Sequence, residues 1–213
     1  MNPFVISTYR SPELFCDREQ ENEELVAAIH NDRNTVITSL RRMGKTSLIR
    51  HIFNSLSTGG DHYLFYIDID QTRSLNDFVN RLANSFLSVP KKSLYEKFLT
   101  LLKKFRPVIT FHPITGQPEV EFRQEGEKQD EVNIESLFRY LDNLDKKVII
   151  AIDEFQRIAA YPHDRTESFL RSHIQHLNNV RFIFSGSSRR LLGSMFNDHS
   201  RPFYQSAGFL DLG

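Results

Sequence analysis

SLRRMGKT, residues 39–46, is the stretch that decides the fold of this chain. It lies between NTVITS (34–39), a β-branched run typical of a short buried strand, and KTSLIRHIFNSL (45–56), which has the pattern of a helix. A loop that leads from a strand into a helix exposes backbone N–H groups at the helix N-terminus, where a bound anion is stabilised. The stretch therefore predicts a phosphate-binding loop at the end of a strand.

Each residue type in the second half of this loop has a chemical reason. Gly44 allows the backbone to approach a phosphate closely, the ammonium of Lys45 reaches the β- and γ-phosphate oxygens, and the hydroxyl of Thr46 ligates magnesium. One departure is Ser39, which stands where the pattern begins with glycine and loses the freedom to adopt a positive φ. The residues expected to contact the nucleotide here are Ser39, Leu40, Arg41, Arg42, Met43, Gly44, Lys45, Thr46 and Ser47.

An acidic pair further along the chain is the second signal. VIIAI (148–152) is a continuous apolar run closed by Asp153 and Glu154, as in a central strand covered on both faces. Because ligands bind outside the carboxyl ends of parallel strands, both carboxylates should face the loop. We expect Asp153 to hold magnesium together with Thr46. Glu154 would act as the general base on the attacking water, with Lys45 as the second catalytic residue; the alternative is a strand that merely ends in solvated acids.

A weaker signal is RFIFS (181–185), followed by a glycine and two serines. It would place hydroxyl groups at the end of a neighbouring strand, where Ser185 or Ser187 would contact the γ-phosphate or the attacking water. The alternative is simply a strand followed by a turn.

The order of predicted elements is that of an α/β fold. Strand and helix patterns alternate at the start of the chain, which favours right-handed crossovers and a parallel sheet. An insertion over about 88–130 interrupts the alternation with a Lys-rich helix (93–105), a β-hairpin around Ile114–Gly116 and a polar link (124–131). The expected strands are 34–39, 62–70, 148–152, 181–185 and 208–212, and the expected core helices are 18–30, 45–56, 74–86, 133–144, 166–177 and 188–196. We expect a single P-loop NTPase domain, a three-layer sandwich, over residues 1–213.

Composition adds limits on location and partners. The chain has 27 basic and 27 acidic residues, so no global field recruits nucleic acid or a membrane. Its single cysteine, the lack of a signal peptide and the lack of a bilayer-length apolar run favour the cytoplasm and no membrane contact. The insertion is locally basic, which suits either DNA, an acidic protein partner or a solvated helix face. These basic residues are Lys91, Lys92, Lys103, Lys104 and Arg106.

Taken together, these motifs resemble the STAND-type ATPases of archaea and bacteria, in the AAA-like (ASCE) branch of P-loop proteins. RRMGKTSL (41–48) is similar to the loop of that family, and further similarities lie in NPF (2–4), DRE (17–19), DEFQ (153–156) and SGSS (185–188). The resemblance covers nearly the whole chain. It implies ATP and Mg²⁺ as cofactors, a parallel sheet of order 5-1-4-3-2, and an adenine site near residues 17–19, with Arg18 in contact with the nucleotide.

The chain departs from this family at two positions. Asp17 stands where the family has glycine, and Ser206 stands where many relatives have arginine. Arg201, Arg189 or Arg190 would have to supply a cation to the transferring phosphate, although each is more simply a surface or ion-pair residue. The resemblance also implies a helical lid and a winged-helix domain after the core, and we expect both to be missing from this chain.

The leading expectation is a Mg-ATP-dependent ATPase that drives a conformational switch and is slow as an isolated domain. ATP is expected over GTP because the guanine-specific motif Asn-Lys-x-Asp is absent. One alternative is a nucleotide-binding regulatory module that does not hydrolyse, as the two departures at 39 and 206 suggest. Another is an ATP-dependent DNA-binding protein that uses the insertion or a missing C-terminal domain. A nucleotide-dependent oligomer, in which a neighbour supplies an arginine finger, is a further expectation.

Overall fold

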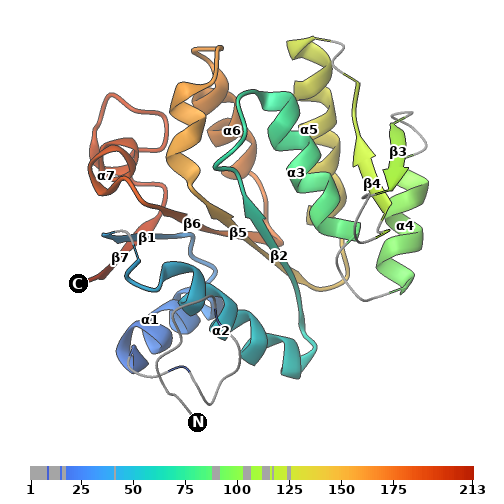
Figure 1. Ribbon diagram of the computed structural model, residues 1–213. Coiled ribbons are helices and arrows are strands. Elements are labelled where there is room, and N and C mark those ends of the chain that lie inside the picture. The colour runs from blue at the N-terminus through green and yellow to red at the C-terminus, as the bar shows by residue number, and fades with distance from the viewer. Residues whose placement is uncertain are drawn as a thin grey trace.

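A five-stranded, all-parallel sheet forms the centre of the computed structural model (Figure 1). The structure describes residues 9, 15, 18–40, 42–87, 92–102, 107–111, 116, 118–123 and 126–213, with the backbone alone at 92–95 and 97. The strands of the sheet are β1 (Thr35–Ser39), β2 (His62–Asp68), β5 (Lys147–Asp153), β6 (Val180–Gly186) and β7 (Gly208–Leu212). The α/β class and the parallel sheet agree with the sequence.

The strand order is β2-β5-β6-β1-β7. This order does not read 5-1-4-3-2, because the expected order counted only the strands of the central sheet, whereas the labels β1 to β7 count every strand of the chain. The antiparallel strands of the insertion, β3 (Val108–Phe111) and β4 (Pro118–Glu121), form a sheet of their own and take two of the numbers.

Helices cover both faces of the sheet. On one face α1 (Glu19–His30) and α2 (Lys45–Gly59) pack on a cluster that includes Ile37, whereas the neighbouring Val36 belongs to the cluster on the other face. Both side chains are fully buried, as expected for a parallel sheet covered on both sides. The second face carries α3 (Leu75–Leu87), α5 (Glu127–Asp142), α6 (Thr166–Ile174), α7 (Arg189–Asn197) and the 3₁₀ helix η2 (Phe155–Ala160).

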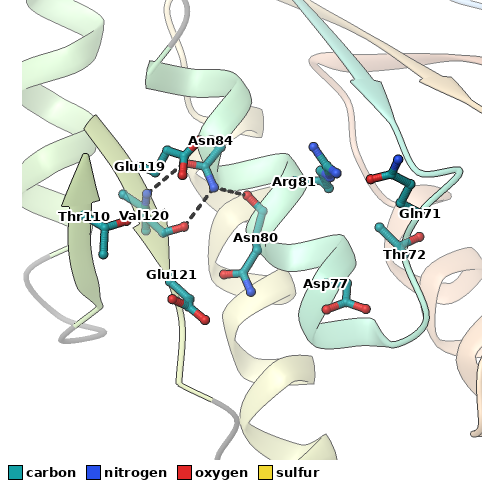
Figure 2. A pocket seen from close by; sticks show the side chains of 10 residues that line it. All are labelled: Gln71, Thr72, Asp77, Asn80, Arg81, Asn84, Thr110, Glu119, Val120 and Glu121. Atoms are coloured by element: carbon teal, nitrogen blue, oxygen red, sulfur yellow. Dashed lines mark hydrogen bonds between the residues drawn. The ribbon is translucent and has the colours of Figure 1, made fainter. Parts of the chain in front are cut away.

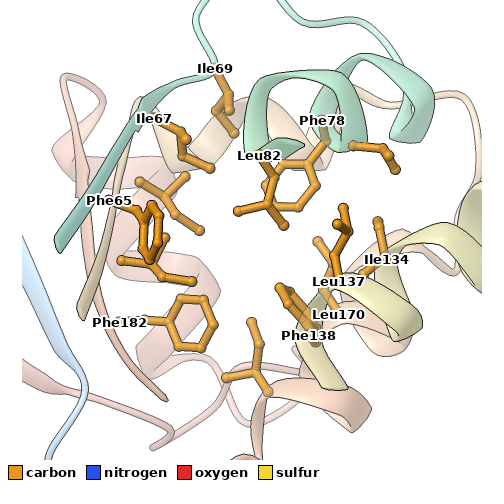
Figure 3. Close-up of a cluster of buried hydrophobic side chains, with 14 of the residues drawn as sticks. Phe65, Ile67, Ile69, Phe78, Leu82, Ile134, Leu137, Phe138, Leu170 and Phe182 are labelled. Atoms are coloured by element: carbon orange, nitrogen blue, oxygen red, sulfur yellow. The ribbon is translucent and has the colours of Figure 1, made fainter. Parts of the chain in front are cut away.

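Aromatic residues fill much of the second layer. Figure 3 shows Phe65 and Ile67 of β2 beside Phe78 and Leu82 of α3, and all four side chains are almost completely buried. Residues that alternate along β2 are buried on this face, as the pleat of a strand requires. This packing positions the carboxyl ends of the strands, where polar residues gather.

The insertion differs from the sequence prediction at its end. Helix α4 (Lys92–Leu102) and the hairpin are present, but α5 begins at Glu127 rather than at 133. Gly126, with φ of 104°, precedes the helix, and acidic residues in the first turn interact favourably with the helix dipole. Residues 127–131 are therefore helical and not a polar link. The basic residues 91, 103, 104 and 106 lie outside the described residues.

Within the part of the chain that the structure describes, no helix combines the length and the apolar character needed to span a bilayer.

Candidate functional site

The predicted phosphate loop connects β1 to α2. Ser39 is fully buried at the end of β1, and α2 begins at Lys45 directly after Gly44. The left-handed residues of the loop are Gly44, with φ of 84°, and Arg42, with φ of 65°. Ser39 itself is extended strand, so the expected cost of replacing a glycine there does not arise. Arg41 lies outside the described residues.

Lys45 is buried and its ammonium group lies against the loop. Nζ donates to Oγ of Ser39 at 2.9 Å and to the carbonyl oxygen of Leu40 at 3.1 Å. The serine hydroxyl in turn donates to the carbonyl of Leu40 at 2.9 Å. The side chain at residue 39 therefore supplies an acceptor for the lysine that a glycine would lack.

Asp153 lies at the centre of the acidic end of β5. Its Oδ2 accepts hydrogen bonds from Oγ1 of Thr46 at 2.8 Å and from the hydroxyl of Tyr66 at 2.8 Å. Its Oδ1 accepts from Oγ of Ser185 at 2.7 Å and from the backbone N–H of Glu154 at 3.0 Å. A carboxylate offers about four acceptor sites, so these donors fix the orientation of a carboxylate that is almost completely buried.

Glu154 follows in the left-handed conformation, with φ of 57°. A non-glycine residue in this region costs on the order of 1–3 kcal/mol and persists when surrounding contacts hold it. Oε2 of Glu154 accepts from Nε2 of Gln156 at 2.5 Å, from Oγ of Ser187 at 2.8 Å and from the N–H of Ser187 at 3.3 Å. The two serines thus divide between the acids: Ser185 orients Asp153, and Ser187 orients Glu154.

Oxygen atoms suited to magnesium meet at this place. Hydroxyl and carboxylate oxygens are hard ligands, and Mg²⁺ is usually held by one or two carboxylates together with water and substrate phosphates. Oγ1 of Thr46 uses its proton toward Asp153, which leaves its lone pairs for a metal. Among the residues that the structure describes, no three His, Cys, Asp or Glu side chains converge as a protein-only metal site. The residues present fit magnesium bound with a nucleotide.

A family comparison agrees with this geometry. Residues 15–202 match the model of the family described as "ATPase domain predominantly from Archaea". The chain belongs to this family of archaeal-type ATPase domains. No curated protein matches the chain.

Solved structures share the fold of this ATPase domain. The Walker-type ATPase PABY2304 of Pyrococcus abyssi has 22% identity and a TM-score of 0.64, with 99% of this chain and 57% of that chain covered. The ORC2 protein of Aeropyrum pernix, in ADPNP and ADP complexes, has 15% identity and a TM-score of 0.57, with coverage of 98% and 50%. The ORC1 protein of the same organism, in complex with DNA, has 17% identity and a TM-score of 0.58, with coverage of 93% and 46%. The chain therefore spans about half the length of these proteins.

Tyr66 is a residue of the ATPase domain's site that the sequence analysis missed. Burial, and then the neighbouring Asp153 carboxylate, raise the pKa of its hydroxyl, so the phenol stays protonated as a donor. The guanidinium of Arg50 lies 5.0 Å from the centre of the Tyr66 ring. The ring packs on the face of the sheet that α2 covers, opposite the face that carries η2. The only sequence signal was its place in β2, two residues before the acidic end of that strand.

Two of the three candidate arginines form ion pairs within the ATPase domain. Arg201 pairs with Glu167 of α6, and Arg189 pairs with Asp211 of β7. Arg190 is exposed and makes no ion pair with a described residue. Two of the three candidates are thus ion-pair residues here.

Arg18, expected near the adenine, is the residue before α1. Its guanidinium pairs with Glu21 at 2.6 Å and lies 3.5 Å from the carbonyl oxygen of Gly213. It is therefore near the end of β7 and on the same side of the sheet as α2, whereas Asp17 lies outside the described residues.

Proposed function

We propose that this ATPase domain binds Mg-ATP at residues 39–47 and hydrolyses its γ-phosphate. The observation that carries the proposal is the hydrogen bond between Thr46 and Asp153, which joins the phosphate loop to the acidic end of β5. In this proposal Lys45 binds the β- and γ-phosphates, and Thr46 and Asp153 hold magnesium. The metal neutralises developing phosphate charge when bound, and Glu154 accepts a proton from the attacking water.

A conformational switch is the second part of the proposal, and it depends on η2. This helix begins directly after Glu154, and its Arg157 pairs with Asp70 in the segment that follows β2. At its far end the hydroxyls of Tyr161 and Thr72 are 2.6 Å apart. A movement of Glu154 on hydrolysis would therefore be transmitted to the β2–α3 segment through the contacts of Arg157 and Tyr161.

Membership of the STAND subgroup, an adenine site beside Arg18, a cytoplasmic location and a nucleotide-dependent oligomer remain proposals from sequence. DNA binding through the insertion has the same status, because Lys103, Lys104 and Arg106 lie outside the described residues. A lid and a winged-helix domain beyond residue 213 are likewise proposed.

The decisive experiment is Glu154→Gln. The amide keeps the size of the side chain but is not a base, so phosphate release should fall by roughly 10²-fold or more while nucleotide binding is retained. Binding is measured by equilibrium titration with a fluorescent ATP analogue, and turnover by release of inorganic phosphate under multiple-turnover conditions.

Lys45→Ala is the matched control, because it should lose binding as well as turnover. Turnover of the Glu154→Gln variant at the wild-type rate would remove Glu154 as the base. If the wild-type protein binds ATP in a Lys45-dependent manner but releases no phosphate, the non-hydrolysing regulatory module is the better description.

A further inference from the structure

The β3–β4 hairpin has one edge that side chains of α3 close. The side-chain amide of Asn84 accepts from the N–H of Val120 and donates to its carbonyl oxygen, both at 2.8 Å (Figure 2). Oδ1 of Asn80 accepts from the N–H of Phe122 at 2.7 Å. Val120 and Phe122 are also buried in the core cluster. The asparagines therefore replace a neighbouring strand and hold the hairpin firmly against α3.

The opposite edge of the hairpin is open. Val120 directs its backbone N–H and carbonyl toward Asn84, so Val120 and its cross-strand partner Ile109 form a non-hydrogen-bonded pair. The backbone N–H and carbonyl of Ile109 therefore point away from β4. Phe111, two residues along, has the same orientation. Among the described residues nothing bonds to these backbone groups. An edge of this kind is a template for one more strand.

The two faces beside this edge differ in chemistry. Ile109 and Phe111 lie on one face, and 52% and 69% of their surfaces are exposed. Thr110 lies on the other face with Glu119 and Glu121 of β4, both exposed and without an ion pair among the described residues. One face is thus apolar, and the other, the acidic face, carries the two carboxylates together with Thr110 and the exposed Val108.

A cavity opens on the acidic face. It has a volume of about 460 Å³, and Thr110, Glu119 and Glu121 form its hairpin side. Figure 2 shows Asp77 and Arg81 of α3 across from them. The side chain of Arg81 is exposed and pairs with none of these acids in the described structure. A long basic side chain that crosses β3 would enter this cavity and meet the two glutamates.

We propose that the open edge of β3 binds an extended segment of a protein partner in which apolar residues alternate with lysine or arginine. The backbone of the segment pairs with Ile109 and Phe111 as a third strand, and its apolar side chains cover those two residues. Its basic side chains lie on the acidic face and extend across β3, roughly 5 Å per strand, to Glu119 and Glu121. If β3 of a second copy of this chain paired with this edge, it could cover only the apolar face. Its residues 108–111 include no charged side chain that could pair with Glu119 and Glu121.

The test uses two labelled synthetic peptides, one alternating valine with lysine and one alternating valine with glutamate. Each is titrated with the 213-residue chain, and binding is followed by fluorescence anisotropy. The lysine peptide should bind and the glutamate peptide should not. Ile109→Pro removes an outward N–H and keeps every bond to β4, because proline is tolerated at the free side of an edge strand. It should weaken binding by roughly tenfold or more, whereas Ile109→Val should not.

Charge reversal provides an independent variant that leaves the strand backbone intact. Glu119→Lys combined with Glu121→Lys should lose the lysine peptide and bind the glutamate peptide instead. Binding that is unaffected by both Ile109→Pro and charge reversal would overturn the proposal. So would a concentration-dependent dimer in sedimentation that Ile109→Pro abolishes while neither peptide binds, because the occupant would then be a second copy of the chain.

Discussion

At the scale of single residues, the position of Glu154 depends on a glycine of the neighbouring strand. A Cβ atom at Gly186 would occupy the place of the side-chain amide oxygen of Gln156. The same amide donates to Glu154, and Ser187, which follows the glycine, donates to the same carboxylate oxygen. Gly186 therefore permits the packing that holds the proposed base. This reason is invisible in the sequence, where SGSS (185–188) indicates only a strand end.

Gly186→Ala should destabilise the protein by about 1–3 kcal/mol, because the new methyl group must displace Gln156 from a buried position. The free energy of unfolding is measured by urea titration. In a Gln156→Ala background, where the obstructing amide is gone, the same substitution should cost much less. An equal cost in both backgrounds would show that the two side chains do not interact as the structure indicates.

At the scale of elements, α3 combines an apolar face with a row of asparagines. Nδ2 of Asn80 donates to Oδ1 of Asn76 at 3.0 Å, and Nδ2 of Asn76 donates to Asp130 of α5 at 2.8 Å. Asn84 continues the row and binds β4. Asparagine is a poor helix former, so these residues contribute through tertiary contacts rather than through helix propensity. The apolar periodicity predicted the helix, but only the structure gave the asparagines a role.

Asn84→Ala should loosen the hairpin, because the N–H and carbonyl of Val120 lose their partners at a cost of about 1–3 kcal/mol each if they stay buried. Hydrogen exchange at the amides of β4 should become faster, while the amides of β1 and β5 stay protected. Asn54→Ala, at an exposed asparagine of α2, is the control. Unchanged exchange at Val120 in the Asn84 variant would contradict the closed edge.

At the scale of the whole molecule, the candidate site joins elements from distant parts of the chain. Thr46 comes from α2, Tyr66 from β2, Asp153 from β5 and Ser185 from β6. Because β1 lies beside β6, and β6 beside β5, the loop after β1 meets the acidic end of β5. The helix α2 covers one face of the sheet, and η2 covers the other. A nucleotide bound here would contact both layers.

Mg-ATP should accordingly stabilise the whole domain. At about 100 times its dissociation constant, a ligand that binds only the folded state adds about 2.7 kcal/mol, or roughly 5–10 °C in the unfolding midpoint for a domain of this size. Thermal scans with ATP, with and without EDTA, measure the shift and its dependence on magnesium. Lys45→Ala should show little shift. An equal shift in that variant would place the nucleotide elsewhere.

The sequence by itself determined the elements around the phosphate loop, the parallel α/β class and the acidic pair after β5, because these signals are local in the chain. A strand, a glycine-lysine-threonine turn and a helix are readable within residues 34–56, and an apolar run closed by Asp153 and Glu154 is readable alone. Only the tertiary structure decided that Tyr66 and Ser185 orient Asp153, and that Gln156 and Ser187 orient Glu154. Two of these hydrogen bonds join β5 to a neighbouring strand, and the bond from Ser187 to Glu154 joins the residues that follow β6 and β5. Their geometry follows from how the strands pack rather than from any spacing along the chain.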